Sequence, residues 1–109
     1  MSHAAMKIEN IHEIGINETG QLYLRPEQER FILIWRSATE VHWNNKENFL
    51  YSPKPREWSY LDWYKQIVSV VANEYNVNLN VTDKTLWSNI PSNLKENIIE
   101  TNSGFQRPL

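Results

Sequence analysis

The first quarter of the chain alternates apolar and polar residues with the period of a β-strand. The alternation runs from residue 11 to residue 25, and residues 17–20 in its middle have a composition typical of a turn. These residues are therefore expected to form a β-hairpin. Pro26 ends its second strand, because proline has no amide hydrogen to donate to a neighbouring strand.

A longer alternating stretch from Phe31 to Trp43 predicts one long strand. One of its two faces is largely apolar, whereas the other begins apolar and becomes charged. On that second face Arg36, Glu40 and His42 are expected to project side by side. A turn and a short returning strand are predicted to follow at residues 44–51.

The region from residue 60 to residue 75 has the three- and four-residue apolar spacing of an amphipathic helix. Ser59 precedes it and Asp62 follows three positions later, which is the pattern of a helix N-cap. Alternation over residues 77–81 predicts another strand, and Pro91 fits the start of a second helix. The predicted fold class is α+β: a mostly antiparallel sheet of about four to five strands on one long helix, with a short C-terminal helix.

One domain is expected to span all 109 residues, with an ordered core from about residue 8 to about residue 101. The first six residues resemble a remnant of an expression vector and are left out of the fold prediction. Residues 102–109 contain Gly104 and Pro108 and are predicted to be a mobile tail.

Composition excludes several kinds of chemistry. The chain has no cysteine, which rules out a disulfide framework, a thiolate zinc site and a cysteine nucleophile within it. Its three histidines lack the spacing of a metal motif, so no metal is predicted. With three glycines it has neither a phosphate-binding loop nor a dinucleotide fingerprint, so no cofactor is predicted.

Charge and hydropathy also limit the partners. The 11 basic residues are scattered and are balanced by 13 acidic ones, so we expect no nucleic-acid binding. No apolar run approaches the roughly 18 residues of a membrane span, and the start does not resemble a signal peptide. A cytoplasmic protein with no membrane partner is therefore expected.

The most distinctive segment runs from Ser52 to Tyr64, at the predicted junction of sheet and helix. Lys54 and Arg56 are candidates for contacting an acidic group, with Trp58 and Tyr60 as rigid contact surface, because arginine and aromatic residues are frequent binding anchors. The structural alternative, which we favour, is that the prolines stiffen the connection and Trp58 covers the core.

Two further interpretations concern catalysis and tryptophan exposure. Glu40 and His42 would lie roughly 6–7 Å apart on one strand face, close enough for an acid–base pair, with Arg36 orienting an anionic substrate. A plain polar patch is the favoured alternative, because no nucleophile accompanies the pair. Five tryptophans exceed the needs of a core this small, and Trp58 and Trp87 are predicted to be the exposed pair. The core is the favoured place for Trp35, Trp43, Trp63, Tyr64 and Tyr75, of which the three helix residues could instead line a ligand pocket.

Residues 40–43 and 52–64 together resemble small single-domain proteins carried on bacterial mobile elements. Integron gene-cassette proteins are the most similar in character, and immunity proteins of polymorphic toxin systems come second. The resemblance implies a compact α+β domain, often a homo-oligomer, without assigned catalytic residues.

The sequence therefore favours a non-enzymatic binding domain over an enzyme. Its expected partner is another bacterial protein or a second copy of the chain, with a dimer as the simplest homo-oligomer, and a small-molecule ligand is compatible with the same surface. Two alternatives stay open: an immunity protein that neutralises a toxin by covering it, and a small enzyme using Glu40 and His42.

Overall fold

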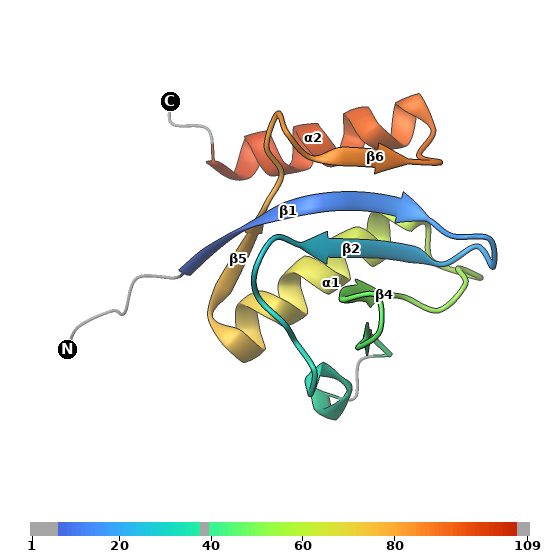
Figure 1. The fold of residues 1–109 in the computed structure, drawn as a ribbon. Coiled ribbons are helices and arrows are strands. Elements are labelled where there is room, and N and C mark those ends of the chain that lie inside the picture. The colour runs from blue at the N-terminus through green and yellow to red at the C-terminus, as the bar shows by residue number, and fades with distance from the viewer. Residues whose placement is uncertain (1–6, 38–39, 107–109) are drawn as a thin grey trace.

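A single mixed sheet organises the molecule (Figure 1). The computed structural model describes residues 7–37 and 40–106. The strand order is β3-β4-β2-β1-β5, and β6 also pairs with β1. Strands β1 and β2, β2 and β4, and β3 and β4 are antiparallel, whereas β5 and β6 run parallel to β1. The strands span β1 (Lys7–Ile16), β2 (Leu22–Pro26), β3 (His42–Asn44), β4 (Phe49–Tyr51), β5 (Val77–Asn80) and β6 (Leu86–Ser88).

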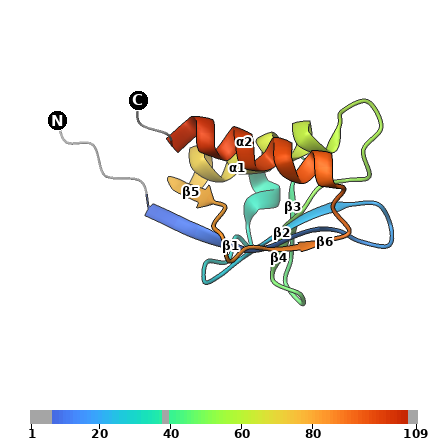
Figure 2. The same ribbon diagram turned by 90° about the horizontal axis from the view of Figure 1, so that it is seen from above.

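Two helices, α1 (Tyr60–Tyr75) and α2 (Ser92–Gln106), lie on the same side of this sheet (Figure 2). Helix α1 begins with the predicted cap: the Asp62 amide donates to Ser59 Oγ, and the Ser59 amide donates to the Asp62 carboxylate, both at 3.1 Å. Each bond satisfies an amide that the first turn of a helix would leave without a partner. The predicted α+β fold with one long helix on the sheet is confirmed, whereas the sequence did not indicate the three-residue strand β6.

The core lies between the sheet and helix α1. Ile14, Leu24 and Leu50 occupy neighbouring strands in register and are 0% exposed. Ile67 and Tyr64 of α1 belong to the same buried cluster, and burial raises the pKa of the Tyr64 hydroxyl. Burying each aliphatic side chain stabilises the fold by about 1.5–3 kcal/mol. Because side chains alternate along a strand, the residues between these core positions face the side without helices.

The long strand predicted over residues 31–43 is wrong. Instead, residues 34–37 form the short 3₁₀ helix η1 (Ile34–Ser37), and only the last part of the segment enters β3. Phe31 and Ile34, which are three residues apart, are buried, and this spacing matches the three-residue turn of a 3₁₀ helix. Three apolar side chains of the segment are left exposed: Ile32, Leu33 and Trp35.

The C-terminal helix α2 packs through the buried side chains of Leu94 and Ile98, whereas Ile99 is 39% exposed. Its backbone continues to Gln106, into the region expected to be a mobile tail. The rest of that tail (107–109) and the suspected vector remnant (1–6) lie outside the described residues. In the described part of the chain, no helix has the length and apolar character needed to cross a membrane.

Candidate functional site

The connection between β4 and α1 contains three of the predicted binding residues, Lys54, Arg56 and Trp58, and it is anchored at both ends (Figure 1). At its start Ser52 is fully buried: its amide donates to the Leu22 carbonyl at 3.0 Å, and its Oγ accepts from the Leu22 amide at 3.3 Å. At its end Ser59 caps helix α1. Two prolines further restrict the backbone between these anchors, so the intervening side chains are presented from a stiff segment.

The side chains of this connection surround a depression of about 470 Å³. We call it the Trp58 depression, and it is lined by Glu40, Pro53, Lys54, Arg56, Glu57, Trp58 and Trp63. Four of the eight predicted binding residues are thus brought to one place. Glu40, which the sequence placed in a different group, comes from the turn before β3.

Two indole rings form the aromatic part of the depression. Trp58 is 45% exposed, and its ring centroid lies 4.7 Å from that of Trp63, with the planes tilted by 47°. Trp63 is 8% exposed, and its Nε1–H has no hydrogen-bond partner among the described residues. An indole N–H that is buried without a partner loses its hydration without compensation. Trp58 is therefore exposed, as its place in the predicted exposed tryptophan pair requires, and Trp63 is a core residue that reaches the depression.

Charges of both signs lie around these rings. Lys54, Arg56, Glu40 and Glu57 are all exposed, and none takes part in an ion pair formed within the described residues. The Lys54 stem runs beside Gly20 in the β1–β2 turn, at 3.4 Å from the position of a Cβ there. The depression therefore offers two cations and two carboxylates that do not neutralise each other by direct contact.

A second depression, of about 430 Å³, also has Trp58 in its lining. Its lining comes from the exposed face of α1: Asp62, Lys65, Gln66 and Ser69, together with Trp58. Trp58 thus contributes to both depressions, one on the connection and one on the helix.

Tyr60 and Trp87, also predicted as binding residues, form contacts within the domain. The Tyr60 hydroxyl donates to the Gly20 carbonyl at 2.9 Å, which ties the start of α1 to the β1–β2 turn. Trp87 packs against the core, and the Lys95 ammonium lies 5.4 Å from its ring centroid. Trp87 is therefore half-buried, and the exposed tryptophans of the described residues are Trp58 and Trp35.

The structure does not bring Arg36, Glu40 and His42 onto one strand face. Arg36 belongs to η1, where its guanidinium lies 5.7 Å from the Trp35 ring centroid. Glu40 precedes β3 with a left-handed φ of 64° and lines the Trp58 depression. His42 starts β3 and lies against Tyr51, with ring centroids 5.3 Å apart. The predicted common face requires a continuous strand, but η1 removes Arg36 from it and the left-handed backbone at Glu40, before β3, separates Glu40 from His42.

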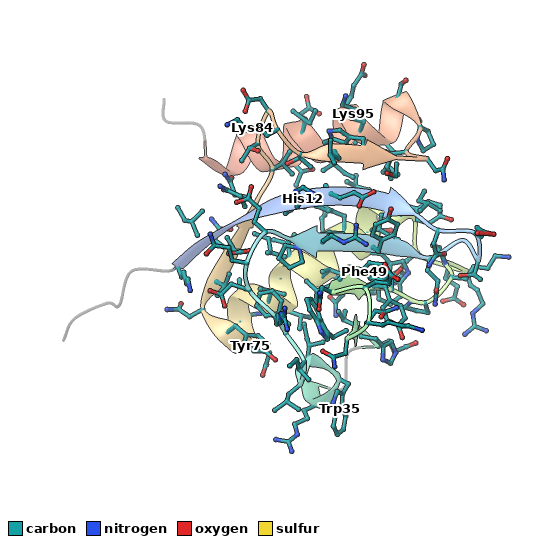
Figure 3. All side chains as sticks on the ribbon, viewed as in Figure 1. His12, Trp35, Phe49, Tyr75, Lys84 and Lys95 are labelled. Atoms are coloured by element: carbon teal, nitrogen blue, oxygen red, sulfur yellow. The ribbon has the colours of Figure 1, made fainter. Side chains whose placement is uncertain are left out.

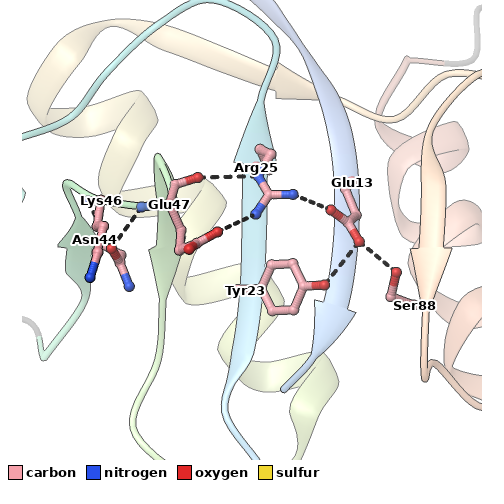
Figure 4. A network of polar contacts seen from close by, with 7 residues as sticks. All are labelled: Glu13, Tyr23, Arg25, Asn44, Lys46, Glu47 and Ser88. Carbon is pink, nitrogen blue, oxygen red and sulfur yellow. Dashed lines mark hydrogen bonds and ion pairs between the residues drawn. The ribbon is translucent and has the colours of Figure 1, made fainter. Parts of the chain in front are cut away.

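A network that the sequence did not single out lies on the sheet face without helices (Figure 4). Glu13 is at its centre: one carboxylate oxygen accepts from Ser88 Oγ and from the Tyr23 hydroxyl, and the other pairs with Arg25. Arg25 continues to Glu47, donating from Nε to its carbonyl at 3.3 Å. Residues of three strands, β1, β2 and β6, and of the β3–β4 turn are thereby connected.

Burial alone raises the pKa of Glu13, but its hydrogen bonds from Ser88 and Tyr23 and the charge of Arg25 lower it below its ordinary value. The same burial, together with the bond to Glu13, raises the pKa of Tyr23. Arg25 also lies over the Phe49 ring, at 5.4 Å from its centroid. Each charged group here has a partner within the network, which makes the network a structural device rather than a free binding surface. The only sequence signal for it was the shared strand parity of Glu13, Tyr23 and Arg25 in the predicted hairpin.

Comparison with known families adds the identity of the chain. Residues 9–85 match the family model described as Integron Cassette Protein Hfx_Cass5. This chain belongs to the Hfx_Cass5 family. The matched range includes every residue that lines the Trp58 depression and ends before β6 and α2.

A solved Hfx_Cass5 structure, described as coming from the mobile metagenome of the North West Arm sewage outfall, is 35% identical in sequence. The alignment covers 87% of this chain and 95% of that one, with a TM-score of 0.44. No curated protein matches the chain. The resemblance to integron cassette proteins is therefore confirmed, and that to immunity proteins stays a prediction. Membership of the Hfx_Cass5 family assigns no activity by itself.

Proposed function

We propose that this Hfx_Cass5 family member is a non-enzymatic binding domain that contacts a protein partner through the Trp58 depression. The observation that carries the proposal is the 45% exposure of Trp58 beside Lys54 and Arg56, two cations with no ion-pair partner among the described residues. A large indole costs hydration free energy when it is exposed, and tryptophan and arginine are the residue types most often found at the centre of protein interfaces.

The rigidity of the segment supports the same function. The buried Ser52 and the capped Ser59 fix the two ends of the connection, and the prolines stiffen its middle. A surface that is already ordered loses little conformational entropy when a partner binds. The second depression beside Trp58 extends the contact surface along α1.

The test compares partner capture by three chains in lysate of a bacterium that carries the cassette. The unchanged chain and Lys84→Ala, an exposed control in the turn before β6, are expected to retain the same protein in stoichiometric amount. The double variant Arg56→Ala/Trp58→Ala is expected to lose it. Retention by all three chains, or by none, would contradict the proposal. A captured toxin that loses its activity in the complex would identify the chain as an immunity protein.

Self-association is a second candidate, favoured by the exposed apolar side chains around η1. Ile32 and Leu33 are each 49% exposed and Trp35 is 57% exposed, and Trp35 lies at the periphery of the molecule (Figure 3). Neighbouring exposed apolar residues of this size are typical of contact surfaces. Light scattering coupled to size-exclusion chromatography tests it: the chain should be dimeric and Leu33→Ser/Trp35→Ser monomeric. A monomer at the highest soluble concentration would contradict self-association.

A further inference from the structure

Opposite charges that share one depression without pairing point to the kind of ligand it accepts. Lys54 and Arg56 are the cations, Glu40 and Glu57 the carboxylates, and no pair of them comes within the distance of an ion pair. A ligand with a single charge would be attracted by one pair and repelled by the other. A ligand with both charges can place each one beside its opposite.

The aromatic lining favours a particular cationic group. Trp58, packed against Trp63 with ring centroids 4.7 Å apart, is the exposed indole of the two, and tryptophan is the aromatic side chain that attracts an ammonium group most strongly. Glu40 and Glu57 add negative charge to the lining of the same depression. An ammonium group that is weakly hydrated, as a quaternary one is, would lose least on entering such a site.

The opposite end of the ligand would be an oxyanion. Lys54 and Arg56 are available to it, since their charges have no ion-pair partner within the described residues. A volume of about 470 Å³ falls in the range of small-molecule sites. The depression on the exposed sheet face that includes Arg25 lacks this property, because Glu13 and Glu47 already engage its only cation.

We propose that the Trp58 depression binds a zwitterionic group, an ammonium paired with a carboxylate a few bonds away. This rests on the proposed function in that the same surface is the binding site, and it adds the chemistry that the surface recognises. Two sources can supply that chemistry: a free small zwitterion, or neighbouring oppositely charged side chains on a partner protein.

The experiment is a nuclear magnetic resonance titration of the five tryptophan indole N–H signals, assigned with Trp→Phe variants. Glycine betaine is the zwitterionic probe, with tetramethylammonium and acetate as its two single-charge halves at equal ionic strength. Glycine betaine is expected to shift the Trp58 and Trp63 signals to saturation. Each half alone should shift them weakly and without saturation.

Variants separate the two ends of the ligand. Arg56→Gln and Glu57→Gln should each weaken glycine betaine binding about two- to fivefold, the size expected for losing an exposed charge contact. The matched controls Lys84→Gln and Glu96→Gln, both exposed and distant in sequence, should leave it unchanged. The signals of residues outside the site report whether each variant is folded, and Lys54→Gln replaces Arg56→Gln if the latter is not.

Every outcome decides the inference. Saturable binding of acetate alone, or of tetramethylammonium alone, as tight as that of glycine betaine would overturn it, and so would equal effects of the site and control variants. Absence of saturation for glycine betaine and for the capped peptide acetyl-Gly-Lys-Glu-Gly-amide would overturn it as well. Binding of the peptide alone identifies a protein segment as the source of the charges. If Arg56→Ala/Trp58→Ala loses the captured partner but the unchanged chain binds neither probe, the proposed function stands and the zwitterion inference fails.

Discussion

The ring of Tyr23 lies against Gly15 on the neighbouring strand, where a Cβ atom would come within 2.4 Å of the Tyr23 ring and hydroxyl. Gly15 is therefore required for close approach. Its missing side chain lets the Tyr23 ring lie near the sheet and direct its hydroxyl to Glu13, at 2.9 Å. A glycine in a strand interior often marks such an approach.

We expect Gly15→Ala to destabilise the fold by about 1–3 kcal/mol, because the added methyl group displaces the Tyr23 ring and breaks its bond to Glu13. Urea unfolding of the chain and the variant measures the cost. In a Tyr23→Ala background the same substitution should cost much less, since the clash is gone. An equal cost in both backgrounds would show that the ring is not the reason for the glycine.

The Glu13 carboxylate should make stability depend on pH. Its folded pKa lies below the ordinary value of 4.5, so its ionised form stabilises the fold. That contribution is complete above the unfolded pKa and is lost as pH falls through the folded pKa. Glu13→Gln should therefore lower the free energy of unfolding by roughly 1.5–3 kcal/mol at about pH 7, and by less as pH falls through the folded pKa of Glu13. Glu96→Gln on α2 is the control. If the difference in free energy of unfolding between Glu13→Gln and the unchanged chain did not become smaller at acid pH, ionised Glu13 would not be the stabilising form.

Much of the fold could be predicted from local patterns. The helix at residues 60–75 and its Ser59 cap depend on neighbours three and four positions away, and the hairpin depends on a turn between two alternating strands. The parallel pairing of β5 and β6 with β1 joins residues far apart in sequence, and alternation within a strand carries no information about it.

The error at residues 31–43 has a physical cause. Residues 31–35 are all apolar, so every spacing fits them, and a strand was as consistent with the sequence as a turn. The tertiary structure selects the three-residue spacing by burying Phe31 and Ile34.

The candidate site also has a part that the sequence could predict and a part that it could not. Lys54, Arg56 and Trp58 are close in sequence, so their grouping was predictable, whereas Glu40 joins them only through the chain path before β3.

The cap of α1 gives a local stability test. Ser59→Ala removes the side-chain acceptor of the Asp62 amide and should cost about 1 kcal/mol in urea unfolding. Ser69→Ala, on the exposed face of the same helix, should be neutral or slightly stabilising, because alanine has the higher helix propensity. If the two substitutions had the same effect, the capping bond would contribute nothing measurable.

Trp35 and Trp63 distinguish the structure from the sequence pattern, because the pattern assigned both to the core whereas the structure exposes Trp35. Because Trp35 is 57% exposed, Trp35→Ala should change the free energy of unfolding by no more than about 0.5 kcal/mol. Trp63, 8% exposed within the core cluster, should cost about 3–5 kcal/mol when replaced by alanine. Urea unfolding below the concentration at which the chain associates isolates these effects from any dimer contact at η1. A large loss in Trp35→Ala under those conditions would mean that the segment packs as the continuous strand, with Trp35 inside.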